Sequence, residues 1–86
     1  MARFEMAATE MSANASSADA FFCLGLMYCI GREVKQDYVA AHKWFNLAAF
    51  KGSDEGKRYR GEIAREMSPG DIAEAQRQAR SWISLR

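Results

Sequence analysis

This chain has little proline or histidine, almost no excess charge, and no long apolar run. Its 86 residues include one proline and one histidine, and 12 basic residues stand against 11 acidic ones. A nucleic-acid-binding domain normally carries a basic patch and a high pI, so a net charge of +1 argues against one. No segment approaches the roughly 18 apolar residues of a membrane helix, and the first residues lack the apolar core of a signal peptide. We therefore expect a cytoplasmic protein that binds neither nucleic acid nor membrane.

Reactive side chains are also scarce. Cys23 and Cys29 stand six residues apart in one expected helix and project about 120° from each other, which excludes a disulfide between them. A metal site would need further ligands, and His42 is the single histidine. Together with Lys43 and Asn46, it falls on a helix face that we expect to be exposed to solvent. The chain has no glycine-rich phosphate loop, so we predict no metal, no cofactor and no enzymatic activity.

Apolar residues at helical spacing are what the chain has in quantity, since 49% of its residues are hydrophobic. Their stripes predict helices over residues 18–30, 38–50, 54–66 and 69–84. Capping chemistry marks the expected helix starts, namely Ser17, Asp37, Ser53 or Asp54, and Ser68 followed by Pro69. Connections of a few residues imply antiparallel neighbours. The predicted fold class is therefore all-α, built of antiparallel helix hairpins.

Residues 1–16 precede these helices and are interpreted as an N-terminal arm. Phe4, Ala7, Ala8 and Met11 form a helical stripe, which favours a short helix over residues 3–12. The chain is thus divided into an arm, residues 1–16, and a helical domain, residues 17–86.

Small residues recur at a spacing typical of helical repeats. Shifting the chain by 36 residues aligns Gly25 with Gly61 and Ala20 with Gly56. Glycine allows a second helix to approach closely, so we interpret Gly25 and Gly61 as equivalent close-packing positions. Helix pairs that recur at about this period are characteristic of α-solenoids.

A dozen residues between Ala20 and Gly52 form an ordered pattern: Ala20, Leu24, Gly25, Tyr28, Gly31, Val34, Asp37, Ala41, Trp44, Ala48, Ala49 and Gly52. This pattern resembles the Sel1-like repeat, a relative of the tetratricopeptide repeat. A second unit keeps Gly56 and Gly61, but Arg60 and Ala64 stand where leucine and tyrosine are expected. The resemblance implies one repeat over 17–52 and a degenerate repeat with a capping helix over 53–86. The expected architecture is an α-α superhelix of about one and a half to two repeats.

The same resemblance implies that the first helix of each pair lines a concave binding side. The partner-binding residues would then be Asp19, Phe22, Leu26 and Cys29 in the first unit, and Glu55, Arg58, Glu62 and Arg65 in the second. Such a groove would be apolar at one end and charged at the other. The four charges are explained either as a solvated face with internal ion pairs or as a rim that selects a charged peptide end.

Three different occupants could cover the apolar end, which includes Phe22, Leu26 and Ile30. They are an N-terminal helix that carries Phe4 and Met11, a second copy of the chain, and a partner peptide. The leading hypothesis is a non-enzymatic interaction or adaptor module, bacterial and cytoplasmic, that binds a protein or peptide through the concave surface. Its candidate apolar anchors are Phe22 and Leu26, with either Phe50 or Trp82 as a further candidate. The alternative is a self-associating structural subunit, a homo-oligomer whose apolar groove is covered by its own copy.

Overall fold

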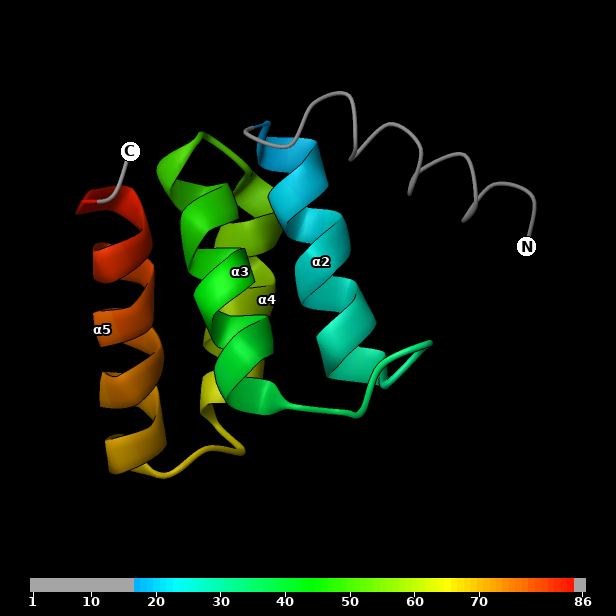
Figure 1. Ribbon diagram of the computed structural model, residues 1–86, viewed down its shortest axis with the longest axis vertical. Coiled ribbons are helices and arrows are strands. Elements are labelled where there is room, and N and C mark those ends of the chain that lie inside the picture. Colours follow the sequence, from blue (N-terminus) through cyan, green and yellow to red (C-terminus); the bar gives the residue numbers. More distant parts are fainter. Residues whose placement is uncertain (1–16, 85–86) are drawn as a thin grey trace.

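The computed structural model describes residues 17–84, and these residues form four α-helices and no strand (Figure 1). The helices are α2 (Ala18–Ile30), α3 (Tyr38–Phe50), α4 (Asp54–Ala64) and α5 (Pro69–Ser84). The predicted all-α class is confirmed for this part of the chain. The expected N-terminal helix, with Phe4 and Met11, lies outside the described residues.

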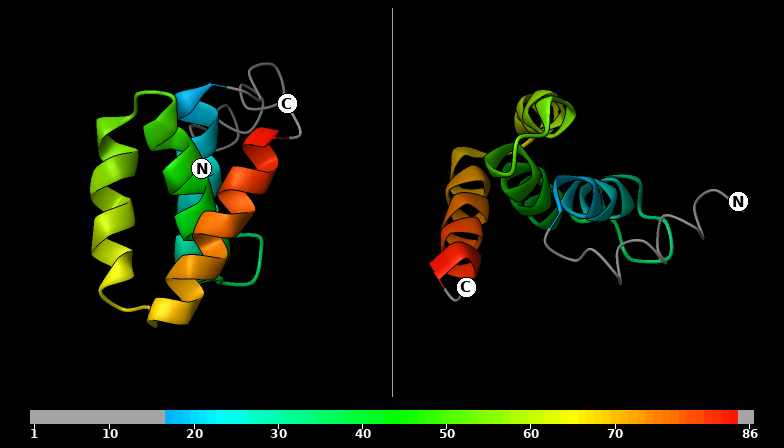
Figure 2. Two further views of the ribbon diagram at one scale, coloured as in Figure 1. Left: turned by 90° about the vertical axis from the view of Figure 1, so that its left-hand side faces the viewer. Right: turned by 90° about the horizontal axis from the view of Figure 1, so that it is seen from above.

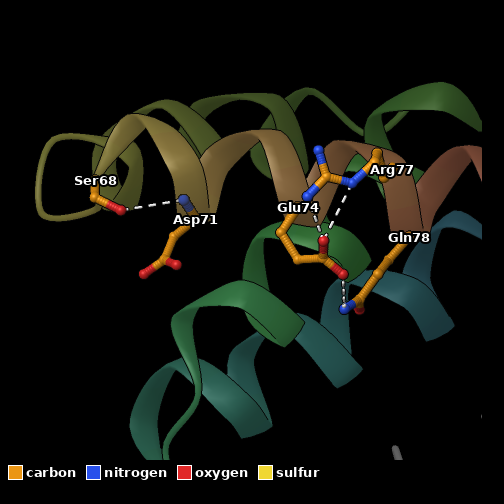
Figure 3. Close-up of polar contacts among 5 residues, drawn as sticks. All are labelled: Ser68, Asp71, Glu74, Arg77 and Gln78. Atoms are coloured by element: carbon orange, nitrogen blue, oxygen red, sulfur yellow. Dashed lines mark hydrogen bonds and ion pairs between the residues drawn. The ribbon is translucent and has the colours of Figure 1, made fainter.

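Each helix starts at a side chain that caps it, as the sequence predicts. An oxygen of the capping residue accepts a hydrogen bond from the amide three residues later, at 2.9–3.1 Å. This bond satisfies an amide that has no partner within the first turn. The pairs are Ser17 with Ala20, Asp37 with Ala40, Ser53 with Gly56, and Ser68 with Asp71 (Figure 3).

The end of α4 differs from its prediction, which placed the last residue at 66. The amides of Arg65, Glu66 and Met67 donate to carbonyls only three residues earlier. These tighter turns end the α-helix at Ala64 and lead into the short connection to α5. An apolar stripe cannot reveal this change, because the residues at the end of α4 are mostly charged.

Helix α3 is the centre of the molecule, since α2, α4 and α5 all pack on it (Figures 1 and 2). Four of its residues, Ala41, Phe45, Leu47 and Ala48, are at most 1% exposed. Helices α2 and α4 touch each other only over a small area. Successive helices α4 and α5 make no extended contact and instead lie on different sides of α3 (Figure 2).

Two apolar clusters hold this arrangement together. In the first, the ring of Phe21 stacks on Trp44 at 5.7 Å between centroids and meets Trp82 edge-on at 5.1 Å. Trp82 thereby attaches α5 to the α2–α3 hairpin. The second cluster centres on Ala41, Phe45 and Ile63 and joins α4 to the same hairpin.

The two glycines interpreted as equivalent have different surroundings. A β-carbon on Gly25 would lie 2.4 Å from Cδ1 of Phe45, whereas one on Gly61 would meet nothing within 4 Å. The close-packed glycine of α4 is Gly56, where a β-carbon would stand 2.8 Å from Cβ of Ala48. The interpretation of Gly61 as a close-packing position is therefore wrong. Gly61 stays exposed because α5 packs on α3 and leaves that side of α4 uncovered.

The expectation that the helix face around His42 is exposed to solvent is also wrong. His42 is only 2% exposed, and Lys43 and Asn46 are half-buried. Helix α4 covers only part of this face, where the guanidinium of Arg60 donates a hydrogen bond to Oδ1 of Asn46 at 2.6 Å, while Lys43 lies beside α5. Burial, together with the positive charge of Arg60, lowers the pKa of His42. A helix packed on three sides leaves little of its surface to water, whatever its own stripe suggests.

Candidate interaction surface on α2 and α4

Three of the four residues predicted on α2 lie together. Phe22, Leu26 and Cys29 are half-buried and pack against the cluster of Phe45 and its neighbours. Asp19, at the start of α2, is exposed and is not part of this packing. The apolar half of the predicted groove thus consists of a short row along α2.

Aromatic rings from two other helices cover Phe22. Its ring lies 5.6 Å from the ring of Phe45 in α3 and 5.3 Å from that of Tyr59 in α4, centroid to centroid. The contact with Tyr59 is edge-to-face, a favourable geometry for aromatic pairs. Phe22 is therefore largely a packing residue. Leu26 and Cys29, which are half-buried in the same cluster, are the remaining candidates of the row for contact with a ligand.

Tyr59 is the functional candidate that sequence reasoning missed. Its spacing identified it as part of the thin apolar stripe of α4, but nothing in the sequence placed it against Phe22. In the structure it joins the apolar row on α2 to the charges on α4, because the guanidinium of Arg58 lies over its ring at 5.4 Å. Contacts of this kind are electrostatically favourable.

The four charged residues predicted on α4 are all exposed: Glu55, Arg58, Glu62 and Arg65. None of them forms an ion pair with another side chain in residues 17–84. The explanation by internal ion pairs is thus not supported, and these charges remain available to a partner. We call the combined set the α2–α4 surface, consisting of Leu26, Cys29, Arg58, Tyr59 and Glu62.

A second polar group lies on α5, on a different side of the molecule. The carboxylate of Glu74 accepts hydrogen bonds from Gln78, at 3.0 Å, and from the guanidinium of Arg77 (Figure 3). These bonds lower the pKa of Glu74. With Lys43, Ser81 and Trp82 these residues line a shallow hollow. The pairs are spaced three and four residues apart on one helix, as ordinary stabilising surface pairs are.

The remaining candidates for chemistry lie apart from one another. Cys23 and Cys29 are half-buried and form no disulfide, and burial raises the pKa of Cys29, which makes its thiol less reactive. Across residues 17–84, no three His, Cys, Asp or Glu side chains gather as metal ligands would. Over the same residues no helix is both long and apolar enough to span a membrane.

The fold and this surface define a small all-α protein of packed helix hairpins with a mixed apolar and charged face on α2 and α4. Comparison with protein-family models, curated proteins and solved structures gave no match.

Proposed function

We propose that this protein is a non-enzymatic interaction module of the Sel1-like type that binds a protein or peptide segment through the α2–α4 surface. The observation that carries the proposal is the position of Tyr59, which brings the half-buried Leu26 row together with the unpaired cation of Arg58. A cytoplasmic setting, expected from the composition of the sequence, and a bacterial one, implied by the resemblance, are part of the same proposal.

The two halves of the surface have different physical tasks. Leu26 and Cys29 offer apolar area beside an aromatic wall, and covering one such side chain contributes about 1–2 kcal/mol before the costs of association. The charges of Arg58 and Glu62 select the orientation and charge of the segment, and they affect the association rate more than the affinity. The expected ligand is a short segment with an apolar side chain next to a charged group.

Peptide selection against the full chain tests this proposal. A random peptide library would be selected on the wild type, and fluorescence anisotropy would then give dissociation constants for the selected peptides. Leu26→Lys is expected to weaken binding at least tenfold, because it places a charge among the apolar contacts. The matched control is Gln76→Lys, which adds the same charge at an exposed position on α5, outside the α2–α4 surface, and should leave binding unchanged.

A charge variant tests the second half of the surface. Arg58→Glu with Arg65→Glu should weaken capture of acidic peptides in a salt-dependent manner. Binding that depends on Phe50 but not on Leu26 would move the anchor away from α2. A library that yields no peptide at all would count against an open groove, and it would favour the alternative in which a second copy of the chain covers the groove.

A further inference from the structure

We propose that the outward face of α4 pairs with the same face of a second copy, with the two helices antiparallel about a two-fold axis. The outward face is the side of α4 that is turned away from α3 (Figure 2). The opposite side of α4 carries its two buried residues, Gly56 and Ile63. The proposal does not rest on the proposed function: it shares Arg58 and Glu62 with the α2–α4 surface, but it does not use the apolar row on α2.

The outward face has a hollow at its centre. Gly61 lacks a side chain, and nothing lies within 4 Å of the point where a β-carbon would stand. Longer side chains surround this point: Asp54, Lys57, Arg58, Glu62 and Arg65. A glycine flanked in this way allows another helix to approach the backbone closely.

The charges on this face are arranged so that they complement themselves. In an antiparallel pair, residues at equal distances on opposite sides of the two-fold axis face each other, because the rise per residue is constant. With the axis between Tyr59 and Arg60, Arg58 of one copy stands opposite Gly61 of the other and next to its Glu62, and Glu62 stands opposite Lys57. The long cationic side chain of Arg58 then lies over the hollow and reaches a carboxylate.

The ends of the helix match in the same register. Arg65 of one copy stands opposite Asp54 and Glu55 of the other, so a basic end meets an acidic end. The two-fold axis repeats each contact, as in any isologous interface. A parallel arrangement would instead place Arg58 on Arg58 and Glu62 on Glu62. Antiparallel pairing also sets the helix dipoles in opposition, which is favourable.

This charge pattern commits the face to a second copy. Its side chains are exposed and form no ion pair elsewhere in the described part of the chain, so pairing breaks no ion pair of the monomer and competes only with the contact of Arg58 with the Tyr59 ring. Any other partner would need the same alternation of charges in the reverse order. Because exposed ion pairs are individually weak, the dimer is expected to be weak and sensitive to salt.

A charge-exchange experiment on the full chain tests the pairing. One variant, Arg58→Glu with Arg65→Glu, makes the face acidic, and a second, Glu55→Lys with Glu62→Lys, makes it basic. Sedimentation velocity at increasing concentration in 50 mM salt should show weak dimerisation of the wild type. Each variant alone should dimerise at least tenfold less, and an equimolar mixture should recover association. All four positions are exposed, and circular dichroism would verify that both variants fold.

Further outcomes separate this inference from the proposed function. Dimerisation of the wild type should fall steeply between 50 and 500 mM salt, and Leu26→Lys should leave it unchanged while it weakens peptide binding. A wild type that stays monomeric at the highest attainable concentration would overturn the inference. So would a dimer that survives both charge reversals, or one that Leu26→Lys dissociates, because it would use the apolar surface instead.

Discussion

The ring of Phe45 lies directly against the backbone of Gly25, so that a β-carbon on Gly25 would stand 2.4 Å from the ring. This contact brings α2 and α3 together at the centre of the hairpin, where Gly25 is buried and Phe45 is fully covered. The corresponding glycine of α4, Gly61, has no such neighbour. One glycine serves packing and the other does not.

Substitution of these two glycines by alanine should have opposite effects. Gly25→Ala forces the Phe45 ring to move and should lower the free energy of unfolding by about 1–3 kcal/mol, the usual cost of overpacking. Gly61→Ala, the matched control, should raise it by up to about 1 kcal/mol through helix propensity alone. Urea denaturation of both variants checks this pair. Equal effects at the two positions would show that Gly25 is not tightly packed.

The burial of His42 should make stability depend on pH. Its pKa is lowered in the folded state, so below about pH 6.5 the unfolded chain binds a proton that the folded chain does not. Stability should therefore fall as pH drops from 7.5 to 5.5, with a limiting slope of about 1.4 kcal/mol per pH unit. Urea denaturation at several pH values measures this slope.

His42→Leu is the informative variant for that effect. Nδ1 of His42 is buried and has no hydrogen-bond partner, so an apolar replacement leaves no new polar atom unsatisfied. The variant should fold and should lose most of the pH dependence above pH 5.5. A wild type whose stability does not change between pH 7.5 and 5.5 would contradict the burial of this imidazole.

Trp82 should be the residue that attaches α5. Its ring contacts both Phe21 and Trp44, at 5.1 and 5.8 Å between centroids. Trp82→Ala should cost about 3 kcal/mol, in the range for loss of a large aromatic side chain, and it should reduce near-ultraviolet dichroism. Trp82→Phe should cost less, since part of the aromatic contact is kept. The neighbouring exposed residue provides a control, because Ser81→Ala should change stability by no more than about 0.5 kcal/mol.

The loop between α2 and α3 contains one strained residue. Glu33 has a φ angle of 66°, a left-handed conformation that costs a non-glycine residue about 1–2 kcal/mol. Glu33→Gly should remove this strain and raise the thermal midpoint. Lys35→Gly, two residues later, should lower the midpoint, because it adds freedom to the unfolded chain without relieving any strain. Thermal unfolding of the two variants would show opposite shifts.

Local chemistry made the helices predictable. Ser17, Asp37 and Ser68 bind amides only three residues away, so a reader of the sequence can place these helix starts without knowing the fold. The apolar row of Phe22, Leu26 and Cys29 was likewise visible from its spacing on one helix. The partners of that row, Phe45 and Tyr59, come from other helices and could not be read from the pattern.

The sequence by itself determined the four helices, because caps, turns and stripes act over a few residues, but it did not show that α4 and α5 lie apart. Tertiary structure alone decided that α5 packs on α3, that His42 is buried beneath α4, and that Gly61 stays open while Gly56 is closed. The physical reason is that burial depends on how many neighbours a helix has. Helix α3 has three neighbouring helices, and the apolar stripe of a single helix does not reveal how many neighbours it has.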